Sequence, residues 1–172
     1  MSQVFRNIAS FVALKTDGTI EAWGAEESGG LTPTLLGNNT GVVDIVASDH
    51  AYAALHESGG ISAWGLEGMG GTLSEALINE TRCERIFPNS GAFTALIRDG
   101  SLFTWGHSEY GGREYNREPL RTVGVSSVVS SERAFAAILV DGSLMFWGNA
   151  RFGGHGPSSA DLRRVGGAGA NF

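Results

Sequence analysis

The side chains most able to do chemistry in this chain are four histidines and a few loop carboxylates. A zinc site needs His, Cys or carboxylate ligands at characteristic spacing, and none of the histidines has such a partner: His50, His56, His107 and His155. Glu26, Glu27 and Glu109 follow the first and third tryptophans at equivalent positions. A catalytic carboxylate pair needs surroundings that separate the two pKa values, and nothing here indicates them. We therefore expect no enzyme activity, no bound metal and no cofactor.

The glycines and the cysteine also give no sign of a phosphate-binding loop or a reactive thiol. A phosphate-binding loop needs a glycine-rich turn that leads into a helix and a Lys-Ser or Lys-Thr pair, and the chain has no such sequence. Cys83 is the single cysteine, so the chain can form no internal disulfide. Neighbouring repeats carry Val42 and Val125 at its position, which favours a buried apolar thiol.

Charge and hydropathy exclude several kinds of partner. The chain of 172 residues has 12 basic and 18 acidic residues and a net charge of −6, which argues against nucleic acid or an anionic membrane as a partner. No apolar run approaches the roughly 18 residues that a membrane span needs. The first residues lack the order of a secretion signal, so we expect the cytoplasm or an organelle interior.

A repeated pattern surrounds the four tryptophans, which are separated by 41, 41 and 42 residues: Trp23, Trp64, Trp105 and Trp147. An aromatic residue lies twelve positions before each tryptophan, a glycine follows it directly, and a Gly-Gly pair lies six and seven positions after it. A period of this length indicates a repeat architecture. Because the tryptophans recur at one place, we interpret them as packing between repeats rather than as a ligand-stacking cluster.

Each repeat predicts three antiparallel strands. Two apolar runs flank a glycine turn, which is the strongest short-range hairpin signal: Asp17-Gly18, Ser58-Gly59, Asp99-Gly100 and Asp141-Gly142. Alanine-rich pieces such as AYAAL are too short for a stable helix. Strands that are apolar on both faces belong to sheets packed between other sheets, and small sheets stacked at a fixed period are the blades of a β-propeller.

We expect one all-β domain over residues 1–172, with blades at about 1–37, 38–78, 79–121 and 122–160 and a partial fifth at 161–172. The fifth unit is indicated by Leu162, Val165 and Phe172, the last of which falls on the aromatic position of Phe11. The chain therefore reads as an arc of a larger or shared propeller.

The repeat V-x-x-I…A-F-x-A-L-x-x-D-G-x-L-x-x-W-G-x-x-x-x-G-G resembles that of the regulator of chromosome condensation family, which implies blades of the kind found in seven-bladed propellers. The family's typical unit is longer and has a His in its second strand, where this chain has Ser10, Ala51, Ala92 and Ala134. The shorter unit is similar to the bacterial propeller-type β-lactamase inhibitor, whose blades have three strands. This departure argues against nucleotide exchange on a small GTPase.

What differs between the repeats is the better guide to function. The four residues between Trp-Gly and Gly-Gly form loops on one rim of a propeller and include types enriched at protein interfaces. The candidate protein-binding residues are Glu26, Glu27, Met69, His107, Tyr110, Asn149, Arg151 and Phe152. We expect a non-enzymatic interaction or scaffold module within a larger assembly, with another protein or protein complex as partner. The alternative is a regulatory propeller that acts as an enzyme inhibitor or as a guanine-nucleotide exchange factor.

Overall fold

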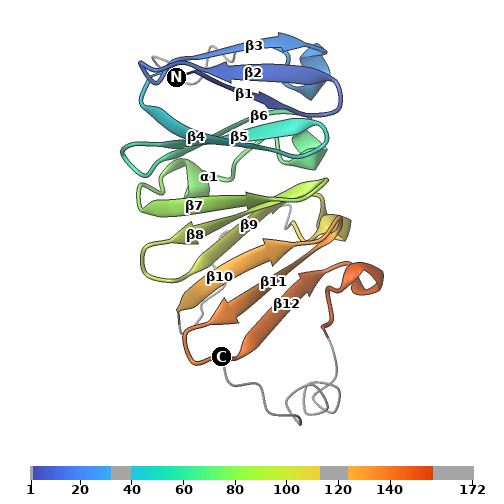
Figure 1. The fold of residues 1–172 in the computed structure, drawn as a ribbon. Coiled ribbons are helices and arrows are strands. Elements are labelled where there is room, and N and C mark those ends of the chain that lie inside the picture. Colours follow the sequence, from blue (N-terminus) through green and yellow to red (C-terminus); the bar gives the residue numbers. More distant parts are fainter. Residues whose placement is uncertain (1, 32–39, 113–123, 157–172) are drawn as a thin grey trace.

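The computed structural model describes residues 2–31, 40–112 and 124–156, and these form four antiparallel sheets of three strands each (Figure 1). The expected all-β, propeller-like arc is confirmed. The expected fifth unit, with Leu162, Val165 and Phe172, lies outside the described residues. The strands are, in blade 1, β1 (Gln3–Arg6), β2 (Ser10–Leu14) and β3 (Ile20–Gly24); in blade 2, β4 (Val42–Ala47), β5 (Ala51–His56) and β6 (Ile61–Gly65); in blade 3, β7 (Cys83–Pro88), β8 (Ala92–Ile97) and β9 (Leu102–Gly106); and in blade 4, β10 (Val125–Ser130), β11 (Ala134–Leu139) and β12 (Leu144–Gly148).

The register is the same in every blade. The second and third strands pair so that the aromatic residue faces the tryptophan, as in Phe93 with Trp105. The hairpin glycines adopt positive φ, for example +83° at Gly100, which glycine tolerates without a steric cost. The first strand of blades 2, 3 and 4 contains one register shift at an equivalent place, consistent with a β-bulge. The predicted hairpins and alanine-rich strands are therefore confirmed.

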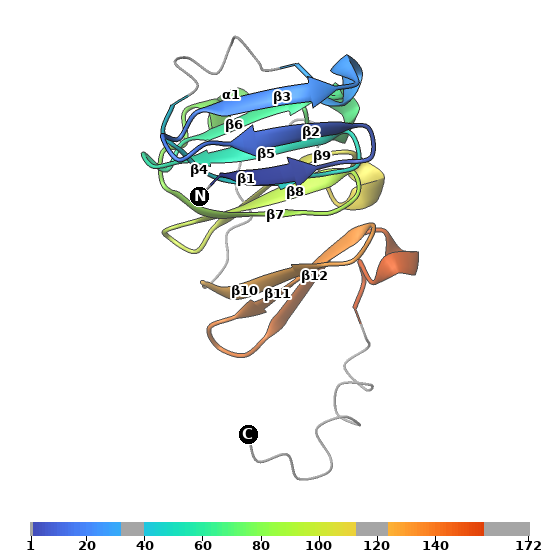
Figure 2. The same ribbon diagram turned by 45° about the horizontal axis from the view of Figure 1, so that its top comes forward.

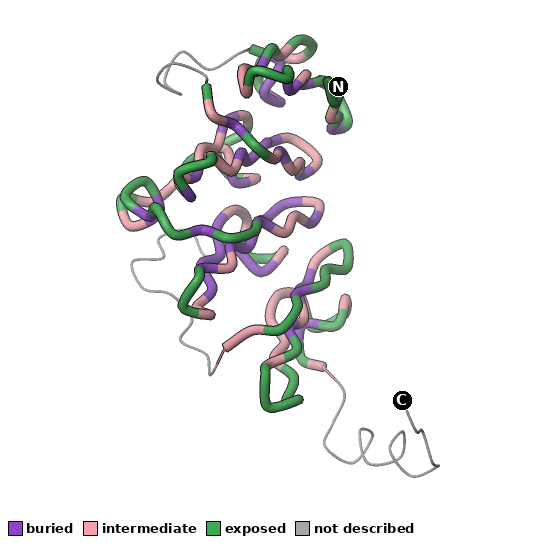
Figure 3. Tube along the Cα trace, turned by 60° about the vertical axis from the view of Figure 1, so that its left-hand side comes forward, coloured by how far each residue is buried: buried purple, intermediate pink, exposed green. Residues whose placement is uncertain are grey.

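The blades stack face to face, and the first strands of successive blades adjoin one another. Figures 1 and 2 show the four sheets following one another in sequence order, with the N-terminus at one end of the arc. Buried residues are concentrated in the two middle blades, while the outer blades contain more exposed and half-buried residues (Figure 3). In β8, for example, five of six residues are buried. The apolar core thus consists of blade interfaces.

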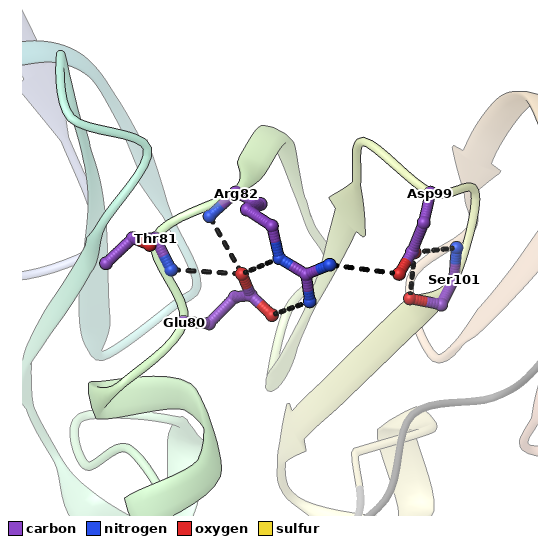
Figure 4. A network of polar contacts seen from close by, with 5 residues as sticks. All are labelled: Glu80, Thr81, Arg82, Asp99 and Ser101. Atoms are coloured by element: carbon purple, nitrogen blue, oxygen red, sulfur yellow. Dashed lines mark hydrogen bonds and ion pairs between the residues drawn. The ribbon is translucent and has the colours of Figure 1, made fainter.

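The linker between blades 2 and 3 contains a single-turn helix, α1 (Glu75–Ile78), which the sequence analysis did not predict. Its Leu77 is fully buried and belongs to the core between blades 2 and 3. Beyond the helix, Glu80 accepts hydrogen bonds from the backbone and side chain of Arg82, which also contacts Asp99 at 3.4 Å in the blade 3 hairpin (Figure 4). This network ties the linker to the next blade.

Each aromatic residue stacks on its paired tryptophan, with ring centroids 5.2 to 5.6 Å apart. Trp64 and Trp105 are buried between blades, 5% and 3% exposed. Trp147 is partly buried, and its indole nitrogen has no hydrogen-bond partner within residues 2–31, 40–112 and 124–156. Trp23 is the exception to the expected packing, since it is 46% exposed. The physical reason is its position in blade 1, because no described sheet lies against that face.

Candidate functional site

The four variable loops share one backbone conformation. Each begins with a residue in extended geometry, continues as one turn of 3-10 helix, and ends at a left-handed glycine. The turns are η1 (Glu26–Ser28), η2 (Glu67–Met69), η3 (Ser108–Tyr110) and η4 (Ala150–Phe152). The closing glycine has φ between +86° and +102°, a region that side chains with a Cβ rarely adopt. All four turns lie along one edge of the arc, on the right in Figure 1.

A polar side chain anchors each of these turns within its own blade. The Asn7 and Asn89 amides donate to the carbonyl of the last 3-10 residue at 2.7 Å, and the Ser48 and Ser131 hydroxyls do so at 3.1 and 2.8 Å. These hydrogen bonds fix the backbone that presents the variable residues. These anchors were not among the residues predicted from the sequence, although an Asn or Ser lies sixteen residues before every tryptophan.

Blades 2 to 4 bring three of the candidate residues into one row. Gly91 separates Met69 from Tyr110, because a Cβ placed on it would lie 3.0 Å from the Met69 sulfur and 2.8 Å from the Tyr110 ring. At the equivalent position of blade 4, the guanidinium carbon of Arg133 lies 5.0 Å from the Tyr110 ring centroid and 4.9 Å from that of Phe152. Arginine over two aromatic faces is a favourable cation–π arrangement.

We name Met69, Tyr110, Arg133 and Phe152 the rim row. All four side chains are partly buried, so they are packed and still reachable from solvent. Arg133 was not among the candidates predicted from the sequence. The sequence does distinguish it, because Arg133 lies fourteen residues before Trp147, at a repeat position where the other blades have Ala9, His50 and Gly91.

A polar cleft of about 470 Å³ lies beside the row, between η3 and η4. Its lining includes Glu109, Arg151 and His155. The Asn149 amide donates to Glu109 at 3.0 Å and thereby joins the loops of blades 3 and 4. His107 makes a T-shaped ring contact with Tyr110, with ring centroids 5.4 Å apart.

Blade 1 contributes differently. Glu26 and Glu27 are exposed, and the structure does not bring them into the row. Ser28 is the blade 1 equivalent of Met69 and Tyr110. It is buried, and its hydroxyl lies 3.0 Å from the His50 Nδ1. The apolar and aromatic character of the rim is therefore confined to blades 2, 3 and 4.

The groups with shifted pKa values lie in hairpins, linkers and blade cores. Hydrogen bonds from Ser101 lower the pKa of Asp99, and the hairpin aspartates Asp17 and Asp141 are lowered in the same way. Burial raises the pKa of Tyr52, whose hydroxyl donates to the Ser10 carbonyl at 2.8 Å.

Within residues 2–31, 40–112 and 124–156, no three His, Cys, Asp or Glu side chains come together in a way that could hold a metal ion. No helix in this part of the chain is long and apolar enough to cross a membrane.

Comparison with known structures defines the class of fold. No protein-family model matches the chain, and no curated protein matches it in sequence. Solved structures do match, and they assign the chain an RCC1-like β-propeller repeat fold.

Among the matching structures are two of yeast RCC1. The structure of Kap60 bound to yeast RCC1 (Prp20) matches with a TM-score of 0.61 and 18% identity, over 85% of this chain and 43% of that one. Prp20p of Saccharomyces cerevisiae, studied with its binding to Gsp1p and histones, gives 0.59 and 20%, again over 85% and 43%. The CRINKLY WD40 ectodomain of the Arabidopsis thaliana receptor kinase ACR4 gives 0.63 and 15%, over 85% and 52%. This chain thus spans about half or less of each of these proteins.

Proposed function

We propose that this chain is a non-enzymatic protein-interaction module that binds another protein through the rim row and the polar cleft beside it. The observation that carries the proposal is Arg133, held between the rings of Tyr110 and Phe152. Arginine, tyrosine and other aromatic residues dominate the energetics of protein interfaces, above all when they cluster. The row places such residues side by side, with acidic and basic groups next to them.

The packing of the row favours binding. Its side chains are already partly buried, and its turns are fixed by hydrogen bonds to Asn89 and Ser131. A partner therefore meets side chains that have lost part of their conformational freedom, which lowers the entropic cost of association. Glu109, Asn149 and Arg151 at the cleft supply polar groups of the kind found around an apolar interface centre.

The structural comparisons support a protein as the partner. The yeast propeller in the first comparison is bound to Kap60, and the second concerns binding to Gsp1p and histones. These partners belong to those proteins, and this chain shares the fold with them at 18% and 20% identity. A regulatory propeller, the alternative, makes the same kind of contact with an enzyme or a small GTPase, so the identity of the partner separates the two functions.

The test compares the native chain with a double variant, Tyr110→Ala with Arg133→Ala, as immobilised bait in an extract of the source organism. Proteins retained by the native chain and lost with the variant are identified, purified and titrated calorimetrically. The matched control is Val140→Ala, because Val140 is 68% exposed and lies outside the rim, at the β11–β12 hairpin. We expect at least a tenfold loss of affinity in the double variant and none in the control.

Two results would refute the proposal. One is that the double variant retains every protein with unchanged affinity. The other is that the control loses binding equally. Circular dichroism of each variant establishes that the fold persists, since Tyr110 also contributes to packing between blades.

A further inference from the structure

The three internal blade interfaces repeat one apolar contact. In each, the aromatic pair of the following blade packs against the left-handed glycine that closes the 3-10 turn of the preceding blade. A Cβ added to Gly29, Gly70 or Gly111 would lie 2.9, 2.6 and 3.2 Å, respectively, from the aromatic side chain of the next blade. At Gly29 and Gly70 the contact therefore leaves no room for a side chain unless the ring moves, and at Gly111 the added Cβ would lie closer than in ordinary packing.

The same interfaces repeat polar contacts. The indole nitrogens of Trp64 and Trp105 donate to the carbonyls of Gly29 and Gly70, at 3.2 and 3.1 Å. A second series joins the loops after the first strands, where the backbone amide of each blade donates to the carbonyl of the next. These hydrogen bonds run from Ile8 to Asp49, from Asp49 to Ser90 and from Ser90 to Glu132.

The outer face of blade 1 presents the aromatic pair, but no described blade places a glycine turn against it. Phe11 and Trp23 stack on each other as in the other blades, with centroids 5.6 Å apart. They are 43% and 46% exposed, and Val4 beside them in the sheet is 62% exposed. In the blades whose preceding face is covered, the corresponding aromatic residues Tyr52 and Phe93 are 0% exposed.

The outer face of blade 4 carries the other half of this contact, the glycine turn. A Cβ on Gly153, which has φ +102°, would meet no atom of the described residues within 4 Å, unlike its three equivalents. An apolar groove of about 380 Å³ surrounds this glycine and is lined by Val129, Ala136 and Phe146. In blade 2 the equivalent face, around the buried Ala53, packs against the aromatic pair of blade 3.

We propose that the outer face of blade 1 docks into the Gly153 groove of a second copy of this chain. The two faces lie at opposite ends of the arc (Figure 1), so one chain does not join them to each other. The internal interfaces specify the contacts: Phe11 and Trp23 cover Gly153, the indole donates to its carbonyl, and the Glu132 amide donates to the Ile8 carbonyl. Such a head-to-tail contact builds a closed ring or a growing chain.

The experiment measures self-association of the purified chain by sedimentation velocity over a wide range of concentration. We expect the native chain to associate reversibly. Trp23→Ser and Gly153→Asn are each expected to abolish association, the first by removing the aromatic surface and the second by adding a side chain where the contact has no room. Asn is chosen because it tolerates positive φ better than most residues.

Each variant has a matched control. Gly142→Asn introduces the same residue in blade 4 at φ +81°, also with no described atom within 4 Å of the added Cβ, but in the β11–β12 hairpin. Ile78→Ser removes an exposed apolar side chain from α1, away from both end faces. Both controls are expected to associate as the native chain does, and circular dichroism establishes that all four variants are folded.

Mixing the two monomeric variants gives the decisive result. The Gly153→Asn chain retains an intact blade 1 face, and the Trp23→Ser chain retains an intact groove, so the mixture is expected to form a one-to-one complex that grows no further. A native chain that stays monomeric at every concentration would overturn the proposal. Folded variants that still associate alone would also overturn it. So would a mixture that forms no complex, because two chains that each retain one of the two unlike faces must bind each other if the contact is head-to-tail.

Discussion

Replacing equivalent tryptophans should have unequal effects on stability, because the same residue lies in different surroundings in blades 1 and 3. Trp105 is 3% exposed and Trp23 is 46% exposed, so Trp105 buries almost twice as much surface. At about 25 cal/mol per Å² this difference amounts to roughly 2 to 3 kcal/mol for a side chain of this size. Trp105 also donates a hydrogen bond to the Gly70 carbonyl, which adds about 1 kcal/mol.

We therefore expect Trp105→Ala to lower the free energy of unfolding by about 5 kcal/mol and Trp23→Ala by about 1 to 2 kcal/mol. Trp105→Phe keeps most of the packing and removes the hydrogen bond, so it should cost about 1 to 2 kcal/mol. The corresponding Trp23→Phe should cost almost nothing, because the Trp23 indole has no hydrogen-bond partner among the described residues.

The assay is urea unfolding followed by far-ultraviolet circular dichroism, since the substitutions change the tryptophan fluorescence itself. All four variants are made in the Gly153→Asn background, so that self-association does not add to the apparent stability of blade 1. Equal losses for Trp23→Ala and Trp105→Ala would refute the reasoning. That result would mean that stacking within a blade, rather than contact with the preceding blade, determines what the tryptophan contributes.

Three further predictions concern a carboxylate, a glycine and the thiol. Burial acts to raise the pKa of Glu80, but hydrogen bonds and charge from Arg82 outweigh it and leave that pKa below its ordinary value. The stability that Glu80 adds over Glu80→Gln should therefore be full at neutral pH and disappear as the pH falls through this lowered pKa, as measured in urea titrations. Gly70→Ala should destabilise more than Gly142→Ala, because both glycines have positive φ but only at Gly70 would a Cβ clash, 2.6 Å from Phe93; melting temperatures check this. Burial raises the pKa of Cys83 to about 12, so a thiol reagent at neutral pH should label the native chain far more slowly than the unfolded chain.

Each of these has a contrary outcome. A constant stability difference between the native chain and Glu80→Gln from neutral to acid pH would show that the carboxylate is not held by Arg82 in solution. Equal melting temperatures for the two alanine variants would mean that the blade interface yields at Gly70. Labelling at equal rates in native and unfolded protein would contradict the burial of Cys83.

The sequence by itself determined the local structure of the blades. The hairpin glycines and the short apolar runs on either side of them act over a few residues, so the register of Phe93 with Trp105 could be predicted from their spacing. The same holds for the positive φ at Gly100, because a turn between two short strands admits few residue types. Among the described elements, α1 and the four 3-10 turns were not predicted, since three or four residues give too little periodicity to read.

Only the tertiary structure decided which equivalent residues differ in role. The sequence gives no reason to separate Trp23 from Trp105, or Gly153 from Gly70, because each pair occupies the same place in the repeat. Their surroundings differ because burial depends on what the neighbouring blade supplies, and blades 1 and 4 each have one face that no described blade covers. The position of Arg133 between Tyr110 and Phe152 has the same origin, since residues in different blades meet only when the blades stack.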